Sequence, residues 1–391
     1  MGEWKEYKID EVAKISTGFA FSGDEYEFKG ILRVVRGENV TIGNLRWDSE
    51  KYWNKATNGL DQYYLQENDI VIGMDGSRVG HNRAKIKSQE LPLILAQRVA
   101  RLRAKEGFDQ GFLWYHIFSD NFKDYVEAVH TGTSIPHISQ KQIADFEIFA
   151  PILESEQTAI SSILSSLDDK IDLLHRQNAT LEKMAETLFR QWFVEEAKED
   201  WVRTKIGDVL DTVLGGTPST KKPEYWDGNI PWINSGEVNN FRILQCSRFI
   251  TELGLKKSNT KLLPVGTTVL AITGATLGQV SLLEIDTCAN QSVVGIIPNG
   301  TLPKEFIFLW IKMKISEIIL SETGGAQPHI NKNDINETDI VIPDSDYLNK
   351  IKLTIEPLFK KITHNSFQIR TLTALRDTLL PKLMSGEVRV D

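Results

Sequence analysis

Two short glycine loops have the residue types and spacing that suit phosphate binding. Each has the pattern Gly-x-x-x-Gly, at Gly76/Gly80 and at Gly274/Gly278, and each follows an apolar stretch that we expect to be a buried strand. Backbone amides and short polar side chains at the end of a rigid strand can contact phosphate oxygens. One such loop could be an ordinary glycine turn, but two at the same point of related segments favour a binding role.

Basic residues follow the first loop. Residues 78–105 contain eight Lys and Arg side chains and a single acid, Glu90. Arg and Lys neutralise phosphates and read the edges of guanine, although the run could also be the solvated face of a strand. In the second segment the lysines occupy other positions: Lys221, Lys222, Lys256, Lys257 and Lys261.

Catalytic motifs are missing from the sequence. Gly215-Gly216 precedes Lys221-Lys222 at the wrong spacing for a nucleotide-binding P-loop. We find no Asn-Pro-Pro-aromatic motif, no Phe-x-Gly-x-Gly for S-adenosylmethionine, and no Gly-x-Ser-x-Gly, His-Glu-x-x-His or Cys-x-x-Cys. These joint absences favour a binding protein over an enzyme and predict no metal site. Cys246 and Cys288 are expected to be buried small apolar residues in a reducing cytosol.

The elements that position the glycine loops occur twice, 191–199 residues apart. Both copies open on a tryptophan, Trp4 and Trp201, and both reach a strand-like exit at a proline, Pro151 and Pro343. Further paired markers are Gly37-Glu38 with Gly236-Glu237, and Pro136-His137-Ile138 with Pro328-His329-Ile330. This period indicates two domain-sized halves related by a pseudo-twofold axis. His137 and His329 lack partners at catalytic spacing, so we expect structural hydrogen bonds.

Each copy continues into a segment with heptad spacing, which predicts a coiled coil. About 35 residues of helix would be roughly 50 Å long, and the two helices should pair antiparallel. Asn178 and Asn365 interrupt the apolar stripe; each could fix the register or face solvent, and Pro381 should end the second helix near residue 380. The predicted coiled-coil residues are Ile160, Leu164, Leu167, Ile171, Leu181, Leu188, Ile351, Ile355, Leu358, Ile362, Leu372 and Leu379.

Length and composition agree with two domains. The 391 residues are 41% hydrophobic and carry a net charge of −8, which argues against a simple nucleic-acid binder. We find no membrane span and no secretory signal, so we expect a cytoplasmic, nucleoid-associated protein. The predicted fold class is α+β, with β-rich globular halves that each contain one helix, near 108–129 and 303–321. The order of the segments is circular, so the chain ends should lie close together.

The sequence resembles the DNA specificity subunit of type I restriction–modification systems. The resemblance rests on PILESEQTAISSILSSLDDKIDLLHRQNATLEKMAETLFRQWF, LRDTLLPKLMSGEV, GGTPSTKKPEYWDGNIPWINSGEV and LAITGATLGQVSLLEIDTCANQSVVGIIP, and extends over essentially the whole chain. It implies target recognition domains at 1–150 and 199–343, a first spacer helix at 151–198, and a second spacer helix with a C-terminal tail at 344–391.

The resemblance implies that each globular domain reads one half of a bipartite, asymmetric site in double-stranded DNA. The helices would set the spacing and dock two methyltransferase subunits, which restriction/translocase subunits would join. S-adenosylmethionine would belong to the methyltransferase; this chain would bind no cofactor and catalyse nothing. The expected DNA contacts are Arg33, Arg36, Asn39, Ser77, Arg78, Arg83, Arg98, Thr217, Ser219, Lys221, Lys222, Asn234, Ser235, Thr273, Thr276 and Gln291.

Two other functions stay open on the sequence alone. One is a coiled-coil scaffold that binds proteins without DNA specificity, which the acidic net charge allows. The other is a self-contained nuclease, which the missing motifs disfavour. A salt-dependent gel shift would separate the first from a DNA reader, and cleavage by the purified chain would identify the second.

Overall fold

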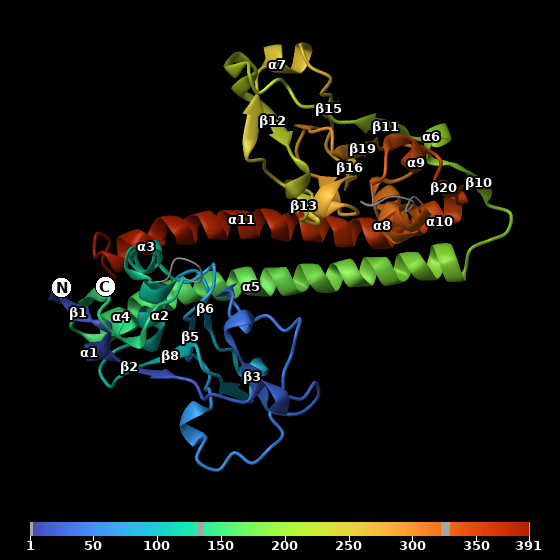
Figure 1. The fold of residues 1–391 in the computed structure, drawn as a ribbon. Helices are drawn as coiled ribbons and strands as arrows, with labels where there is room; N and C mark the ends of the chain where they lie inside the picture. The colour runs from blue at the N-terminus through green and yellow to red at the C-terminus, as the bar shows by residue number, and fades with distance from the viewer. Residues whose placement is uncertain (1–2, 132–135, 322–328, 391) are drawn as a thin grey trace. The chain divides into compact units, whose positions relative to one another are not determined.

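The computed structural model of the chain describes residues 3–131, 136–321 and 329–390, and residue contacts divide it into two units (Figure 1). Unit 1 comprises Met1–Lys170 and Leu372–Asp391, and unit 2 comprises Ile171–Thr371. Both boundaries fall inside long helices, α5 (Glu154–Arg190) and α11 (Glu356–Met384). Each long helix therefore contributes one part to each unit.

The strands of unit 1 are β1 (Trp4–Lys8), β2 (Ala13–Thr17), β3 (Arg33–Val35), β4 (Ile42–Gly43), β5 (Ile70–Gly73), β6 (Arg83–Lys85), β7 (Leu93–Leu95), β8 (Val99–Ala104) and β9 (Glu147–Pro151). They form a five-stranded sheet in the order β2-β8-β5-β6-β4, a parallel pair β3-β7, and an antiparallel pair β1-β9. The central strand β5 is buried along its whole length, which fits its continuous apolar sequence.

The strands of unit 2 are β10 (Val202–Lys205), β11 (Asp211–Leu214), β12 (Trp226–Ile233), β13 (Arg242–Ile243), β14 (Arg248–Ile250), β15 (Leu262–Leu263), β16 (Thr268–Ala271), β17 (Val280–Leu283), β18 (Thr287–Ala289), β19 (Val293–Ile297) and β20 (Asp339–Ile342). Their five-stranded sheet, β11-β19-β16-β17-β13, repeats the topology of unit 1, as does the pair β10-β20. The parallel pair β12-β18 corresponds to β3-β7 and gains β14 and β15 as neighbours. The predicted duplication is confirmed, with β14 and β15 as additional strands in unit 2.

Short helices complete both units. They are α1 (Ile9–Val12), α2 (Gln110–Phe118), α3 (Asp120–Val129), α4 (Gln140–Ala144), α6 (Ile206–Val209), α7 (Glu252–Lys256), α8 (Lys304–Ser321), α9 (Lys332–Asn336) and α10 (Ser345–Lys350). The helix expected near 303–321 is α8. The one expected near 108–129 is instead two helices, because Ser119 is extended and its hydroxyl accepts a hydrogen bond from the Phe122 amide and so caps α3.

The long helices run antiparallel within each unit. In unit 2, Asn178 of α5 pairs with Asn365 of α11 at 2.9 Å, and in unit 1 Asp168 of α5 pairs with Arg376 of α11 at 2.9 Å. Residue numbers rise along one helix as they fall along the other. The antiparallel pairing that the heptads predicted is therefore confirmed in both units.

The heptad residues are buried to different degrees. Five of the predicted set are buried: Ile160, Leu164, Ile351, Ile355 and Ile362. The others are half-buried: Leu167, Ile171, Leu181, Leu188, Leu358, Leu372 and Leu379. The first group packs into the globular cores as well as along the helix pair, apart from Ile362. The apolar stripe thus serves two interfaces, and each buried side chain contributes about 1.5–3 kcal/mol.

Pro381 does not end the second helix, contrary to the expectation from sequence. Helix α11 continues to Met384, and the carbonyl of Pro381 accepts a bond from the Ser385 amide at 3.0 Å. Pro381 is exposed in the last turn, where water can satisfy the carbonyl that loses its partner.

The two ends of the chain meet in unit 1. The guanidinium of Arg389 lies 4.9 Å from the centroid of the Trp4 ring, and both residues contact the Glu156 carboxylate, at 3.3 Å and 3.0 Å. The circular organisation predicted from the repeat is thereby confirmed. No helix among the described residues is both long and apolar enough to cross a membrane.

Candidate nucleic-acid interface

Matching backbone hydrogen bonds show which loop residues of the two units are equivalent. In unit 1 the residues after β2 and the residues after β5 both bond to the segment between β7 and β8. In unit 2 the residues after β11 and those after β16 bond in the same way to the segment between β18 and β19. The corresponding bonds are Gly18 N to Val99 O and Gly215 N to Val293 O, Phe19 N to Leu95 O and Gly216 N to Ala289 O, and Met74 N to Arg98 O and Ile272 N to Ser292 O. These loops form one candidate surface per unit.

The glycine loops lie at the predicted strand ends. Gly76 follows β5 with φ of +98°, and Gly274 follows β16 with φ of +74°, a left-handed conformation that favours glycine. Ser77 and Arg78 are exposed beside the first loop, while Thr273 and Thr276 are half-buried in the second. The two loops therefore offer different side chains on the same backbone frame.

Arg98 extends from the loop between β7 and β8. Its Nη1 donates to Asp75 Oδ2 at 2.8 Å, while most of its side chain stays exposed. The residue itself has a φ of +64°. Arg98 and Asp75 thus tie two loops together, and the guanidinium keeps donors free for a ligand.

The predicted contact Asn39 must be withdrawn. Its side chain is 1% exposed, accepts from the Arg36 amide at 3.0 Å and donates to the Arg46 carbonyl at 3.0 Å. It closes the 3-10 turn Gly37–Asn39, whose hydrogen bonds match those of Ser235–Glu237 in unit 2. Gly37 is therefore equivalent to Ser235. The sequence comparison had paired Gly37 with Gly236, which is one residue further along.

Arg33 and Arg36 lie beside this turn and are half-buried. Arg33 stacks on Trp47 with its guanidinium carbon 4.4 Å from the ring centroid and pairs with Glu50 at 3.5 Å. Arg36 pairs with Glu38 and donates to the Ser49 carbonyl at 2.8 Å. Both guanidinium groups already have acidic partners, so their charge is largely balanced within unit 1.

Arg83 is the second predicted contact that must be withdrawn. It is 4% exposed, and its guanidinium donates to three carbonyls, those of Gly80, Phe118 at 2.7 Å and Ser119 at 3.1 Å. Burial lowers its pKa to about 10, so it stays charged at neutral pH. Arg83 thus closes the end of α2 from inside the unit instead of facing a partner.

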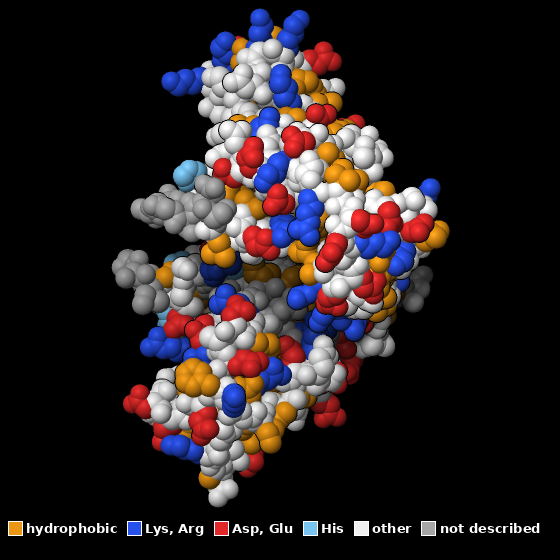
Figure 2. All heavy atoms as spheres, turned by 90° about the vertical axis from the view of Figure 1, so that its right-hand side faces the viewer, with side chains coloured by type: hydrophobic (Ala, Val, Ile, Leu, Met, Phe, Trp, Pro, Cys, Tyr) orange, Lys and Arg blue, Asp and Glu red, His pale blue; other side chains and the backbone are white. Residues whose placement is uncertain are grey.

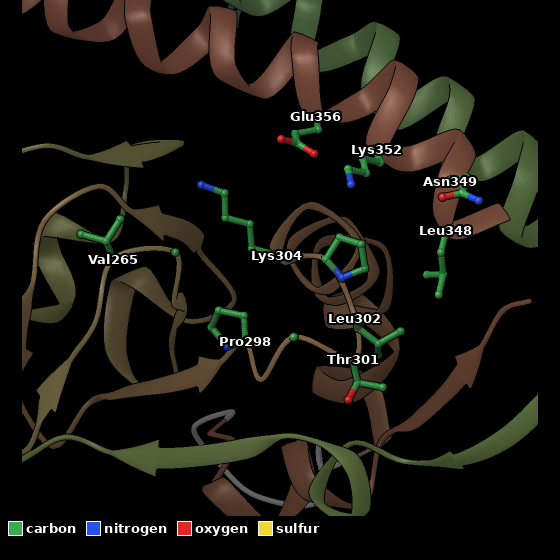
Figure 3. A pocket seen from close by; sticks show the side chains of 12 residues that line it. Val265, Pro298, Thr301, Leu302, Lys304, Leu348, Asn349, Lys352 and Glu356 are labelled. Atoms are coloured by element: carbon green, nitrogen blue, oxygen red, sulfur yellow. The ribbon is translucent and has the colours of Figure 1, made fainter. Parts of the chain in front are cut away.

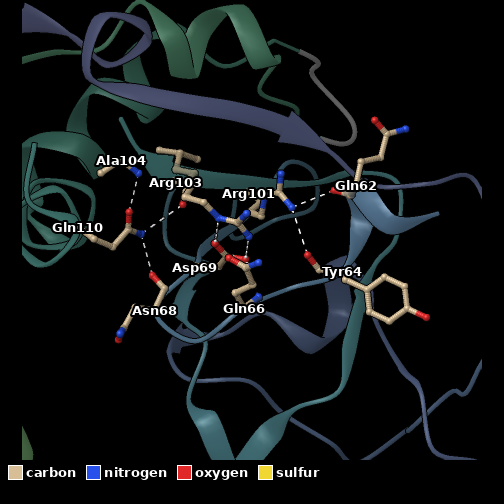
Figure 4. Close-up of polar contacts among 10 residues, drawn as sticks. Gln62, Tyr64, Gln66, Asn68, Asp69, Arg101, Arg103, Ala104 and Gln110 are labelled. Carbon is tan, nitrogen blue, oxygen red and sulfur yellow. Dashed lines mark hydrogen bonds and ion pairs between the residues drawn. The ribbon is translucent and has the colours of Figure 1, made fainter. Parts of the chain in front are cut away.

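Two further arginines of the basic stretch bond to other groups of unit 1 (Figure 4). Arg103 forms a bidentate pair with Asp69, with both distances at 2.7 Å, and Arg101 donates to the carbonyls of Gln62 and Tyr64. Burial lowers the pKa of Arg101. Part of the positive charge in residues 78–105 therefore belongs to arginines that form hydrogen bonds and an ion pair within unit 1.

Unit 2 brings several predicted residues together around one pocket of about 540 Å³. Thr217, Ser219, Lys222 and Gln291 line it, together with Lys257. Thr217 Oγ1 donates to Gln291 Oε1, and Lys222 Nζ donates to Tyr225 Oη at 3.0 Å, which raises the pKa of Lys222. The pocket combines hydroxyl and amide groups with two lysines at its rim.

Lysine and arginine side chains also gather at the α7 end of unit 2, the upper end of Figure 2. Lys221, Lys256 and Lys257 are exposed there. Asn234 and Ser235 are half-buried, and Asn234 accepts from the Gly236 amide at 2.7 Å to cap its turn. The lysines are therefore better placed for a long-range contact with phosphates than the asparagine is.

Sequence reasoning missed Gln97 and the role of Lys257. Gln97 is exposed in the loop after β7, at the position equivalent to Gln291. Aligning the two loops from Val99 and Val293 backwards would have revealed it, because no residue is inserted between these points. Lys257 is distant from Lys222 in the sequence, and only the fold brings the two lysines to the same pocket.

A second pocket lies elsewhere in unit 2 and contains none of the predicted contacts. It has a volume of about 410 Å³ between the loops at 265–266 and 298–304 and the helical residues 348–356. Lys304, Lys352 and Glu356 extend into it (Figure 3).

Among the described residues, no group of three or more His, Cys, Asp or Glu side chains is arranged to hold a metal ion.

Comparison with known proteins agrees with this architecture. The chain is 25% identical to the type I restriction enzyme MjaIX specificity subunit of Methanocaldococcus jannaschii over 422 aligned residues, covering all of this chain and 94% of that protein. It is 24% identical to the EcoBI specificity subunit of Escherichia coli, covering 98% of this chain and 86% of that one. The fold matches the crystal structure of a type I S subunit from M. genitalium with a TM-score of 0.67 and 18% identity, over 98% and 96% of the two chains.

A family model also matches the chain, once for each copy of the repeat. The model of the type I restriction modification DNA specificity domain matches residues 1–183 and again residues 198–372, one match for each copy of the repeat. The resemblance first drawn from the sequence is confirmed, and the chain belongs to the family of type I restriction modification DNA specificity domains.

Proposed function

We propose that this chain is the DNA-reading subunit of a type I restriction–modification complex, and that each globular domain reads one half of a bipartite, asymmetric site. The proposal rests chiefly on one observation: the two domains share a backbone frame but present different side chains from it. Ser77 and Arg78 in the first loop stand against Ala275 and Thr276 in the second. Equal frames with unequal side chains would read two different DNA sequences.

The long helices would hold the two readers at a set distance. Helix α5 has 37 residues, which corresponds to about 55 Å of helix, or about 16 base pairs at 3.4 Å per step. That length is an upper bound on the spacer, because both ends of the helix pack within the globular units. The domain boundaries predicted from sequence, 1–150, 151–198, 199–343 and 344–391, serve as working boundaries for this model.

The outer faces of the helices would dock the other subunits. Large apolar side chains are exposed there, including Leu173, Met184 and Leu375, and such residues on a polar helix suit a protein partner. We propose two methyltransferase subunits as the partners, with restriction subunits joining the complex. The methyltransferase would bind S-adenosylmethionine and flip its target adenine, while this chain would take no part in the chemistry.

Modified-base sequencing tests the proposal directly. DNA from the native host is sequenced with the gene present and with the gene deleted. We expect a bipartite N6-methyladenine motif that disappears on deletion. An unchanged methylome would overturn the proposal.

A scaffold without DNA specificity predicts a different binding result. If the chain only joins proteins, the complex with methyltransferase should give no sequence-dependent gel shift at any salt concentration. A DNA reader should give a shift on the motif duplex whose affinity falls steeply with salt. A matched duplex with a scrambled half-site serves as the control.

A further inference from the structure

We propose that Gln97 and Gln291 read the same base, an adenine, at equivalent positions of the two half-sites. This inference rests on the proposed function and adds that the two half-sites, although different, share one A·T pair.

The equivalence of the two glutamines follows from hydrogen bonds on both sides of them. Leu95 and Ala289 accept the bonds from Phe19 and Gly216, and Arg98 and Ser292 accept those from Met74 and Ile272. Both flanking pairs are 194 residues apart, and so are Gln97 and Gln291. No insertion separates them, so the two glutamines occupy equivalent positions in their loops, although the backbone differs at the next residue, where Arg98 has a φ of +64°.

The residues beside the glutamines differ between the two units. Ala96 stands against Asn290, and Arg98 stands against Ser292. Retention of a buried residue would follow from packing alone, but Gln97 and Gln291 are both exposed. The same exposed glutamine is therefore present in both units although the residues beside it differ. This pattern points to one feature of the DNA that both half-sites share.

In each unit a glycine at the end of a neighbouring strand packs directly against the loop that carries the glutamine. A Cβ atom at Gly18 would lie 2.1 Å from the Ala96 carbonyl oxygen, and one at Gly215 would lie 2.1 Å from the Asn290 carbonyl oxygen. Only glycine permits this approach, so in each unit a neighbouring strand end rests directly on the loop. A rigid loop lowers the entropy cost of presenting the side chain to DNA.

The amide chemistry of glutamine selects adenine. Glutamine can accept from adenine N6 and donate to N7 at the same time, which no other base edge in the major groove allows in that order. Thr217 Oγ1 donates to Gln291 Oε1 and thereby restrains the amide, whose second lone pair and Nε2 hydrogens stay available. Lys222 and Lys257, at the rim of the same pocket, can contact the phosphates on either side.

The test replaces each glutamine in the full chain and sequences the methylome of the native host. We expect Gln291→Ala to relax one adenine position in one half of the motif, and Gln97→Ala to relax the corresponding position in the other half. Methylation at sites with another base there should rise about fivefold or more. Gln89→Ala and Gln245→Ala, which alter exposed glutamines outside these loops, should leave the motif unchanged.

A second substitution distinguishes the loss of base reading from a general loss of DNA binding. Gln291→Glu offers two acceptors and no donor, so we expect it to shift the preference at that position from adenine toward cytosine. If Gln291→Ala abolishes methylation altogether, a new cytosine-containing motif with Gln291→Glu would support the inference, and loss of all methylation would overturn it.

The outcomes distinguish this inference from the proposed function. A wild-type chain that directs no bipartite motif overturns the proposed function itself. A normal wild-type motif that both alanine variants leave intact, or that they weaken evenly at every position, overturns only the reading of adenine by Gln97 and Gln291.

Discussion

The side chains of Asn178 and Asn365 meet between the two long helices, where Asn365 Nδ2 donates to Asn178 Oδ1 at 2.9 Å. They are 8% and 0% exposed. Asn178 also donates to Ser366 Oγ at 3.2 Å. The heptad pattern allowed each asparagine to face solvent, but both are buried and one hydrogen bond joins them. A buried polar pair in an apolar stripe fixes register, because a shift of either helix would leave both amides without partners.

Removing one asparagine should be worse than removing both. We expect Asn365→Leu to lower the free energy of unfolding by about 1–3 kcal/mol, since Asn178 Oδ1 would be buried without the donor that it now has. The double change Asn178→Leu/Asn365→Leu should recover most of this loss. Urea unfolding followed by circular dichroism measures both. A double variant as unstable as the sum of the single variants would show that the pair is not coupled.

The pair of Arg242 and Glu284 should be a large contributor to the integrity of unit 2. The two side chains are buried 3.0 Å apart, and the guanidinium carbon lies 4.4 Å and 4.5 Å from the ring centroids of Phe241 and Phe359. We expect Arg242→Met to cost about 3–5 kcal/mol, because Glu284 would become an unpaired buried charge. Adding Glu284→Leu should restore part of the stability in guanidinium unfolding. No recovery would mean that packing of the arginine, not its charge, is what matters.

His116 should make unit 1 sensitive to acid. Burial lowers its pKa from 6.5 to about 3, so in the folded state it resists protonation. The unfolded chain binds the proton below pH 6.5, and stability is therefore lost as the pH falls from 6.5 toward 3, by about 1.4 kcal/mol per pH unit. We expect His116→Phe to flatten this part of the stability profile, whereas His175→Gln, at an exposed site on α5, should not. Parallel profiles for His116→Phe and wild type would contradict the assignment.

Lys222 and Lys257 should contribute affinity without specificity. Each can neutralise one phosphate, so each change to alanine should reduce the slope of log affinity against log salt by about 1 and weaken all sequences alike. Fluorescence anisotropy on the complex with methyltransferase would measure the slope. Lys314→Ala serves as the control, since Lys314 pairs with Glu317 on α8. A change in the recognised motif would indicate base contacts instead.

A circularly permuted chain should fold. Trp4 and Arg389 are in contact, so a short linker can join the two ends, and new ends can open between Glu196 and Trp201. That segment is exposed and lies between α5 and β10. We expect the permuted chain to direct the same methylation motif as the natural one. A permuted chain with native circular dichroism but no motif would show that chain order matters for assembly.

Periodic patterns determined most of the architecture. Heptad spacing predicted both long helices and their antiparallel pairing, and the repeat predicted duplicated sheets and chain ends that meet at Trp4 and Arg389. These features depend on many residues that each contribute a little, so single deviations such as Pro381 or the break at Ser119 change a boundary without changing the fold.

Only the tertiary structure decided which polar side chains are free to meet a ligand. Arg83 and Asn39 have the composition of DNA contacts but are buried, because their partners, the carbonyls of Phe118 and Arg46, are brought to them by folding. Backbone hydrogen bonds established that Gln97 is equivalent to Gln291, and the structure showed that both side chains are exposed. A polar side chain is satisfied by whichever groups surround it in three dimensions, and a linear sequence does not record those neighbours.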